Sequence, residues 1–362
     1  MKFVLFYHSL LSDWNHGNAH FLRGLASELV ERGHQVEVYE PADGWSLSNL
    51  RAEQGEGPLK AFANAYPKLF TNLYRSLNLS KALEDADLVL VHEWNDAELV
   101  ARVGQERQRG HFALFFHDTH HRMLTAREQM RSYDLSHYDG VLAYGRVLTN
   151  LYLETGRTKR AWTWHEAADV RVFQPLEDVA KTQDVIWIGN WGDNERAAEI
   201  QEFFIEPVKR MRLRAVVNGV RYPEEGLRLL ADAGIDFRGW IANFNVPRVL
   251  ATARVTLHIP RRPYAKALPG IPTIRPFEAL ACGIPLISSF WDDVEGLFRP
   301  GKDYLEARDS QEMKEHLRAI LSNESLAADL AAHGLETVRS RHTCAHRADE
   351  LLEIYDQVSK SR

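Results

Sequence analysis

The sequence predicts an α/β protein of two doubly wound domains, each built around a parallel sheet. Short runs rich in β-branched and aromatic residues alternate with longer segments of helical periodicity, which is typical of βαβ units. The chain has 362 residues, more than a single hydrophobic core usually supports. We therefore expect two such domains, joined by a linker.

In the first half, six strands are expected at 3–7, 35–39, 88–92, 112–116, 141–144 and 161–164. The first two enclose a helix, because apolar residues between them recur every three or four positions until Gly33. The segment from about 44 to 80 is amphipathic but weakly patterned, and we expect a helical excursion there.

The second half repeats the alternation. Its strands are expected at 184–188, 215–218, 237–239, 255–259 and 285–288, and its helices around 194–210, 223–233, 246–252, 275–282 and after 309. A polar segment with a proline, 169–183, is interpreted as the linker. The expected organisation is thus a first domain at 1–168, a second at 184–345, and a C-terminal helix at 346–362 that is a candidate for packing back on the first domain.

Composition limits the partners and the compartment. Forty-four basic and 50 acidic residues leave a net charge of −6, which argues against nucleic acid as a partner. The two cysteines, Cys282 and Cys344, cannot build a disulfide framework and fit a reducing cytoplasm. No apolar run reaches the roughly 18 residues that a transmembrane helix needs, so we expect no membrane span.

Two loops of the first domain carry candidate functional residues. In "YHSLLSDWNHGNAHF", Gly17 and Asn18 can present backbone N–H groups to an anion at a helix start. His16 and His20 add imidazoles, although an ordinary strand–helix turn with capping or solvated histidines is an equal alternative. The loop has no G-x-G-x-x-G, so a dinucleotide fingerprint is not supported.

The second loop, "FFHDTHHRM", is the densest polar cluster of the chain. A histidine beside an aspartate can act as a general base, so His117 and Asp118 are catalytic or substrate-binding candidates. A metal at His117, His120 and His121 would require a further ligand that nothing nearby supplies. The remaining alternative is a structural helix start.

In the second domain, "IWIGNWGDNERAAEI" follows the first strand. Gly189 allows close backbone approach, Asn190 suits a turn, and Arg196 is a cation near a helix start. A cation opposes the helix dipole there, which a phosphate ligand would explain; an ordinary exposed arginine is the alternative. Trp240, after "GIDFRG", is a candidate surface for a nucleobase or else a core residue.

The segment "LHIPRRPYAKALPGIPTIRPFEALACGIPLIS" concentrates positive charge in a proline-rich loop. Its Arg261, Lys266 and Arg275, together with Arg262, suit a diphosphate at the mouth of the sheet. Glu278 follows at the start of an apolar helical turn, where it reads either as a cap or as a ligand contact.

With these loops placed, the chain resembles GT-B glycosyltransferases, in particular the family 4-like and spore-maturation-protein-type group. "IRPFEALACGIPLIS" is similar to the family pattern E-A-x-A-C-G-x-P, and "ADVRVFQP" is similar to its interdomain linker. The resemblance implies two Rossmann-like domains facing a central cleft. The second domain would bind a nucleotide-diphosphate sugar such as a UDP- or GDP-sugar, and the first a carbohydrate, lipid or small-molecule acceptor.

The resemblance also assigns residues. Glu278 matches the glutamate that binds ribose hydroxyls, Arg196 lies near the diphosphate ligands, and His117 or Asp118 lies near the transferred sugar. A metal-independent hexosyltransferase without a cofactor is expected, because such enzymes generally use no catalytic metal.

One position departs from the pattern. The family usually has a second glutamate eight positions before the ribose ligand, and this chain has Gly270 there. An inverting reaction with His16, His20 or Asp118 as base therefore stays open. So do two other functions: a nucleotide-sugar 2-epimerase of the same fold and a non-catalytic sugar-nucleotide-binding protein.

Overall fold

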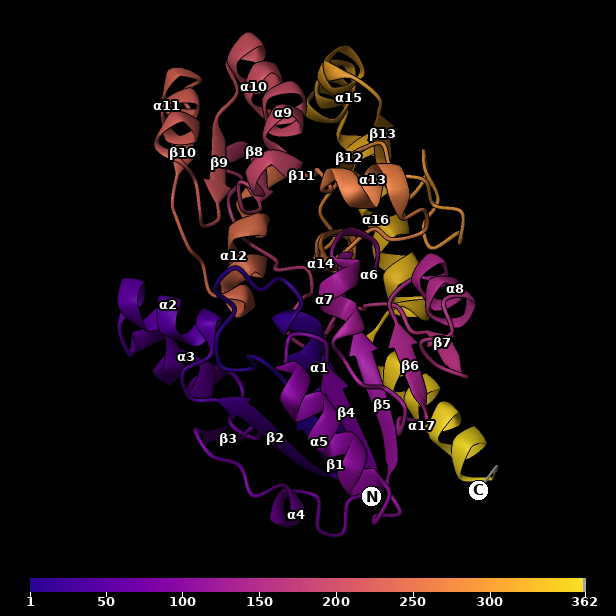
Figure 1. The fold of residues 1–362 in the computed structure, drawn as a ribbon. Helices are drawn as coiled ribbons and strands as arrows, with labels where there is room; N and C mark the ends of the chain where they lie inside the picture. Colours follow the sequence, from indigo (N-terminus) through magenta and orange to yellow (C-terminus); the bar gives the residue numbers. More distant parts are fainter. Residues whose placement is uncertain (361–362) are drawn as a thin grey trace. The chain divides into compact units, whose positions relative to one another are not determined.

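The computed structural model describes residues 1–360 and divides into two compact units. Unit 1 comprises residues 1–166 and the C-terminal segment that begins at Cys344, and unit 2 comprises Ala167–Thr343 (Figure 1). Each unit contains one parallel sheet with flanking helices, as the sequence predicts. The expected linker, 169–183, has neither helix nor strand until the first strand of unit 2 begins at Gln183.

The sheet of unit 1 has the strand order β3-β2-β1-β4-β5-β6-β7, and all its neighbours are parallel. Its strands are β1 Lys2–Phe6, β2 Gln35–Pro41, β3 Thr71–Tyr74, β4 Leu88–His92, β5 Ala113–Asp118, β6 Gly140–Ala143 and β7 Ala161–Thr163. The central strands β4 and β5 are buried along their whole length. Burial on both faces explains why they read as continuous apolar runs rather than as alternating ones.

The helices of unit 1 are α1 Ala19–Glu31, α2 Trp45–Gln54, α3 Gly57–Ala65, α4 Leu79–Ala82, α5 Ala97–Arg107, α6 Arg122–Thr125, α7 Arg127–Arg131, α8 Arg146–Glu154 and α17 Cys344–Ser359. The C-terminal helix α17 contacts α1. An ion pair of 2.5 Å joins Arg32 to Asp349, and the indole of Trp164 donates to the carbonyl of Arg347 across 3.0 Å. These contacts explain why the end of the chain belongs to unit 1.

The sheet of unit 2 has the order β10-β9-β8-β11-β12-β13 and is also parallel. Its strands are β8 Gln183–Ile188, β9 Ala215–Asn218, β10 Asp236–Phe237, β11 Ala253–His258, β12 Leu286–Ser289 and β13 Leu305–Ala307. Its helices are α9 Ala197–Ile200, α10 Glu206–Met211, α11 Glu224–Asp232, α12 Val246–Ala251, α13 Arg262–Ala267, α14 Ile274–Ala281, α15 Ser310–Ser322 and α16 Glu324–Arg341.

Four details differ from the sequence prediction. Strands β3 and β13 were not expected; both are short and lie at the edges of their sheets, where little of the strand is buried. The proline-rich loop contains the short helix α13, because proline is tolerated in a first helical turn. The expected helix at 194–210 is interrupted between α9 and α10 by a π-helical turn, Gln201–Ile205.

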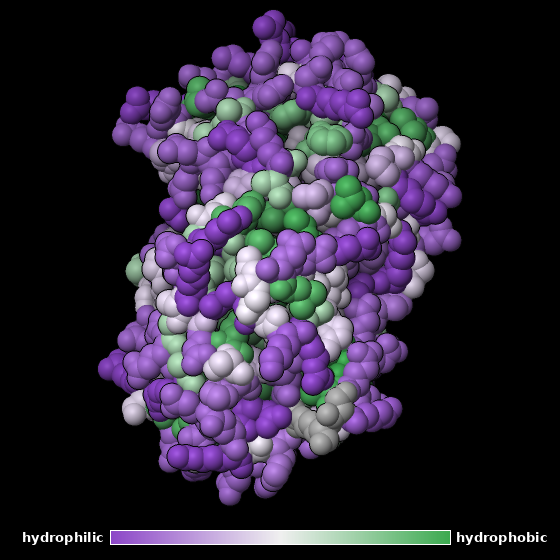
Figure 2. All heavy atoms as spheres, turned by 45° about the vertical axis from the view of Figure 1, so that its right-hand side comes forward, coloured by the Kyte–Doolittle hydropathy of each residue, from purple (hydrophilic) through white to green (hydrophobic). Residues whose placement is uncertain are grey.

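One face of the molecule is predominantly polar. On the face drawn in Figure 2, hydrophilic residues cover most of the area and hydrophobic residues form small patches. Within residues 1–360, no helix combines the length and the apolar character needed to cross a membrane.

Candidate functional site

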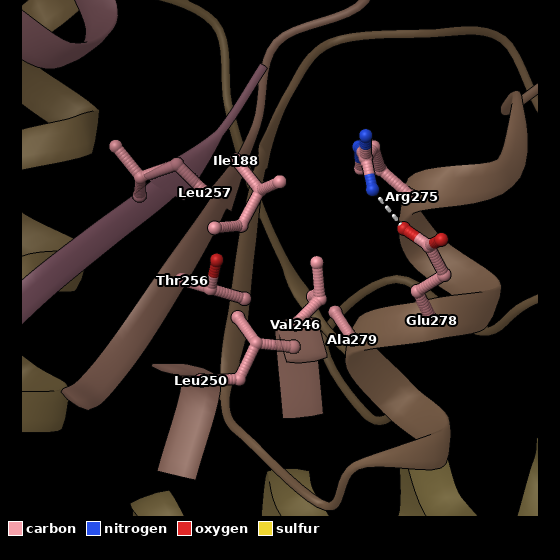
Figure 3. A pocket seen from close by; sticks show the side chains of 8 residues that line it. All are labelled: Ile188, Val246, Leu250, Thr256, Leu257, Arg275, Glu278 and Ala279. Atoms are coloured by element: carbon pink, nitrogen blue, oxygen red, sulfur yellow. Dashed lines mark hydrogen bonds and ion pairs between the residues drawn. The ribbon is translucent and has the colours of Figure 1, made fainter. Parts of the chain in front are cut away.

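Glu278 lies on α14 in unit 2 and is buried, with only 1% of its surface exposed. Its Oε1 accepts a hydrogen bond of 2.9 Å from Nδ2 of Asn243, and its Oε2 is paired with the guanidinium of Arg275 (Figure 3). A buried carboxylate is costly unless charged or polar groups compensate it. These two partners hold the carboxylate in one orientation, so Glu278 is not a solvated helix cap.

The pair Glu278–Arg275 forms one wall of a small pocket in unit 2 (Figure 3). The other lining residues come from α12, α14 and the strands β8 and β11: Ile188, Val246, Leu250, Thr256, Leu257 and Ala279. An apolar lining with a few fixed polar groups is typical of a small-molecule site. The cavity itself is only about 10 Å³, room for about one water molecule; it marks the place where the fixed carboxylate and guanidinium meet an apolar wall.

Arg196 immediately precedes α9, and its guanidinium donates to two backbone carbonyls, those of Asn190 and Ile259. Among the described residues it forms no ion pair with a carboxylate. Burial, together with the nearby charges of Arg261 and Arg275, lowers its pKa to about 9. The guanidinium is still charged at pH 7 and, unlike Arg261 and Arg275, has no carboxylate in an ion pair with it among the described residues. A buried cation of this kind favours an anionic ligand.

The other cations of the basic segment are less available than the sequence suggests. Arg261 forms an ion pair of 3.0 Å with Glu195, and Arg262 forms one of 3.0 Å with Glu199. Lys266 is exposed in the last turn of α13. The charges of these two arginines are balanced within the protein, and the expectation that the basic loop binds a diphosphate stays a prediction.

Gly189 and Asn190 have structural partners. A side chain at Gly189 would lie 2.6 Å from the ring of Trp187, so the close approach that this glycine permits is to the chain itself. The Oδ1 atom of Asn190 accepts from the backbone N–H of Val220 across 2.9 Å. Trp240, the expected nucleobase surface, is half-buried and does not line the pocket beside Glu278.

The position that lacks the expected glutamate, Gly270, lies next to another carboxylate. A Cβ atom built on Gly270 would be 2.5 Å from Oε1 of Glu295, and the residue has a φ of +87°. A side chain at position 270 would thus be strained and would displace Glu295. The carboxylate at this place comes from a segment 25 positions later in the sequence, which no local motif could indicate.

In unit 1, the expected pairing of His117 with Asp118 is wrong. The two residues are consecutive on β5, and successive side chains of a strand point to opposite faces. The ring of His117 packs against Phe21 and Trp164, whereas Asp118 accepts a hydrogen bond of 2.7 Å from the hydroxyl of Tyr152. Asp118 therefore cannot orient the imidazole of His117.

Both side chains are also completely buried. Burial lowers the pKa of His117 to about 3 and raises the pKa of Asp118 to about 6. Asp118 also accepts the backbone N–H of His120, which tightens the turn after β5. These contacts give Asp118 a structural role within unit 1.

The loop after β1 brings other groups together. Asn18 caps α1 without a side-chain capping bond; instead its Nδ2 donates to Oγ1 of Thr119 across 2.7 Å. His16 is buried, with its ring centroid 4.1 Å from that of His8. His20 is buried within α1 and Gly17 precedes that helix. The loop thus places Asn18 beside Thr119, which follows β5, and His16 beside His8 of the same loop.

Sequence reasoning missed several polar residues at the carboxyl ends of strands. In unit 1 these are His8 after β1, and His92, Glu93 and Trp94 at and after β4; in unit 2 it is His258 at the end of β11. Asn243, in the turn before α12, and Glu295, in the loop after β12, were missed as well. His8 and His92 each adjoin an expected strand end, where ligands of parallel sheets bind. The places of His8 and His92 in the sequence could therefore have indicated them as candidate site residues.

A metal site does not emerge from these clusters. Across the part of the chain that the structure describes, no group of three or more His, Cys, Asp or Glu side chains could hold a metal ion. The histidines of unit 1 are packed against each other and against aromatic rings instead.

Two parallel sheets in separate units, each flanked by helices, are the architecture of GT-B proteins. Residues 16–171 match the family model described as Glycosyltransferase Family 4, and residues 196–353 match a model described as glycosyl transferase-like. The chain belongs to the glycosyltransferases. The resemblance seen in the sequence is confirmed at this level, and the spore-maturation-protein-type subgroup stays a prediction.

Solved structures agree in fold. Sucrose-phosphate synthase of Thermosynechococcus elongatus has a TM-score of 0.67 and 16% identity, with 100% of both chains covered. Anabaena HepE in complex with UDP has a TM-score of 0.70 and 14% identity, with 99% of this chain and 100% of that one covered. The same Anabaena protein, solved with UDP-glucose, has a TM-score of 0.68 and 13% identity over equal coverage. The comparison with curated proteins gave no match.

Proposed function

We propose that the protein is a hexosyltransferase that transfers a sugar from a UDP-sugar, bound by unit 2, to an acceptor hydroxyl. The observation that carries the proposal is Arg196, a charged guanidinium close to Arg261 and Arg275 with no carboxylate in an ion pair of its own among the described residues. A diphosphate supplies the negative charge that this arrangement favours. The complexes of the Anabaena protein with UDP and UDP-glucose support the choice of nucleotide and of a hexose.

Glu278 is the proposed ribose ligand. Its carboxylate is fixed by Asn243 and Arg275 on the wall of the pocket, and an oriented carboxylate is a strong acceptor for two adjacent hydroxyl groups.

Glu295 is the proposed carboxylate beside the donor sugar. It occupies the space next to Gly270, where the resemblance places a glutamate. We expect Glu295→Gln to lower the turnover of the donor more than its affinity. If Glu295→Gln were as active as the wild-type protein, Glu295 would not be the carboxylate beside the donor sugar.

The proposed reaction breaks the bond between the anomeric carbon and the diphosphate oxygen and joins the anomeric carbon to the acceptor oxygen, which loses its proton. Arginine side chains stabilise the leaving diphosphate electrostatically, a task that other enzymes assign to a metal ion. Metal independence, the absence of a cofactor and a cytoplasmic location remain predictions. Transferase activity that persists in the presence of EDTA would support metal independence.

The deciding experiment has two stages. Thermal shift with UDP, GDP, ADP, TDP and CDP identifies the nucleotide, since a ligand of the folded state raises the melting temperature. The matching nucleotide sugars are then incubated with and without acceptors. Release of the nucleotide only with acceptor supports transfer, and binding without turnover contradicts it.

A further inference from the structure

Trp94 is an exposed indole at the carboxyl end of β4 in unit 1. It follows the strand by two positions and has 41% of its surface exposed, although its neighbours Glu93 and Asn95 are buried. The chain on both sides of Trp94 is therefore anchored, while its ring is accessible to a ligand.

The indole is held in place by its surroundings. The guanidinium of Arg122 lies 3.8 Å from the ring centroid of Trp94, and the same guanidinium forms a buried ion pair of 2.5 Å with Glu93. The ring of His120 approaches the indole edge-on, with a centroid distance of 5.0 Å. A ligand that stacks on Trp94 would thus meet a preorganised surface, which lowers the entropic cost of binding.

A chain of neutral hydrogen-bonding groups adjoins this surface. The His8 ring lies 6.2 Å from the Trp94 ring, and Nδ1 of His8 is 3.2 Å from Nδ1 of His92. Nε2 of His92 is 3.0 Å from the hydroxyl of Thr119, which also accepts from Asn18. The second ring nitrogen of His8, Nε2, has no hydrogen-bond partner among the described residues.

The hydrogen-bond chain can run in two directions. If the Thr119 hydroxyl donates to His92, then His92 donates to His8 and Nε2 of His8 carries a proton. If His92 donates to Thr119, then Nε2 of His8 is an acceptor. The exposed end of the chain can therefore either donate to a hydroxyl group or accept from one.

The imidazoles of His8 and His92 carry no charge. Burial lowers the pKa of His8 to about 3 and that of His92 well below its usual value, so both rings are neutral at physiological pH. The nearest ionic groups, Arg122 and Glu93, are paired with each other, and burial raises the pKa of Glu93 to about 8. The two neutral imidazoles themselves offer hydrogen bonds that suit a hydroxyl group.

We infer that Trp94 and His8 form a subsite of unit 1 that binds the sugar ring of a carbohydrate acceptor. A pyranose offers one apolar face of C–H groups, which suits a rigid indole, and a rim of hydroxyls, which suits a neutral imidazole. A lipid chain would use the indole but leave His8 without a partner. The assignment of an acceptor rests on the proposed transferase function, whereas binding of the sugar can be tested without it.

The test is saturation-transfer NMR on the full-length protein with methyl glycosides of glucose, galactose and mannose, and with octanol as the apolar probe. We expect at least one glycoside to bind, and Trp94→Ala to weaken it tenfold or more while Trp94→Phe keeps part of the affinity. His8→Asn should reduce binding as well. Phe70→Ala is the control, because Phe70 is 76% exposed and precedes β3. It therefore lies at the amino ends of the parallel strands, whereas Trp94 lies at their carboxyl ends.

No bound glycoside, equal binding by Trp94→Ala, or preference for octanol would each overturn the inference. The melting shift with UDP is measured on the same samples. A Trp94-dependent glycoside signal without a UDP shift contradicts the proposed donor but preserves the sugar subsite. A UDP shift that needs Glu278, without a glycoside signal, preserves the donor site and removes the subsite.

Discussion

Asn243 donates a hydrogen bond of 2.9 Å to the carboxylate of Glu278, 35 positions further along the chain. Asn243 belongs to the turn before α12, and Glu278 lies on α14. Together with Arg275, Asn243 determines the direction in which a buried carboxylate faces the pocket of unit 2. The first two predictions follow from this relationship.

Replacing Glu278 should weaken nucleotide binding. For Glu278→Ala and Glu278→Gln we expect a loss of about 1–3 kcal/mol in the free energy of UDP binding, because charge-assisted hydrogen bonds to the ribose are lost. Isothermal titration calorimetry measures this loss in binding free energy. Glu225→Gln, a change at an exposed position of α11, is the control. Unchanged affinity in a folded Glu278 variant would contradict the assignment.

Removing Asn243 should act through Glu278. Asn243→Ala is expected to cost about 0.5–1.5 kcal/mol in UDP binding, the usual net value of one hydrogen bond. In a double-mutant cycle with Glu278→Ala the two losses should not add, because both changes affect one interaction. Full additivity would show that Asn243 does not position the carboxylate.

Arg196 is expected to recognise the diphosphate rather than the nucleoside. Arg196→Lys should reduce the affinity for UDP by about tenfold or more, since an ammonium group cannot replace the planar guanidinium. The affinity for uridine should stay nearly constant, so the ratio of the two affinities is the informative quantity. Arg228→Lys, at an exposed position on α11, serves as the control. A parallel loss for uridine and UDP would indicate a general structural effect.

Acidification should destabilise unit 1 through His117. The unfolded chain binds a proton at this residue near pH 6.5, whereas the folded protein, with a pKa of about 3, does not. The unfolded state therefore binds more protons, and the free energy of unfolding falls as the pH decreases from 6.5 towards 3. Between pH 7 and 5.5 the loss is about 1 kcal/mol for this histidine.

Denaturant unfolding across that pH range measures the slope. His117→Asn should make the slope shallower by the share of this histidine, irrespective of its effect on stability at pH 7. His8 and His92, whose pKa values are also lowered, should maintain the remainder. His111→Asn, at an exposed position before β5, should leave the slope unchanged. A slope that is the same in wild type and His117→Asn would show that the buried histidine does not govern the acid response.

A side chain at Gly270 should destabilise unit 2. Gly270→Ala combines a φ of +87° with a contact to Glu295, and we expect a loss of about 1–3 kcal/mol in stability. Gly296→Ala is the matched comparison, because Gly296 also has a positive φ, +64°, but has nothing within 4 Å of the added atom. Adding Glu295→Ala should rescue part of the first loss only. Equal losses of stability in Gly270→Ala and Gly296→Ala would show that Glu295 moves away from the added methyl group without a measurable loss of free energy.

The sequence by itself determined the alternation of strands and helices and hence the class of fold. It also indicated Glu278 and Arg196, because a carboxylate in an apolar helical turn and a cation near a helix start are both locally anomalous. Even the opposite faces of His117 and Asp118 follow from the two-residue period of a strand. These conclusions depend on interactions between residues that are close in the chain.

Only the tertiary structure decided which polar groups are partners. His8 contacts His92 because β1 and β4 are neighbours in the sheet, 84 positions apart in the sequence. Glu295 reaches Gly270, and Glu195 and Glu199 neutralise Arg261 and Arg262, through contacts between separate segments. Strand order and register set these pairs, and because neither is encoded in local periodicity, the sequence alone could nominate the charges but not their partners.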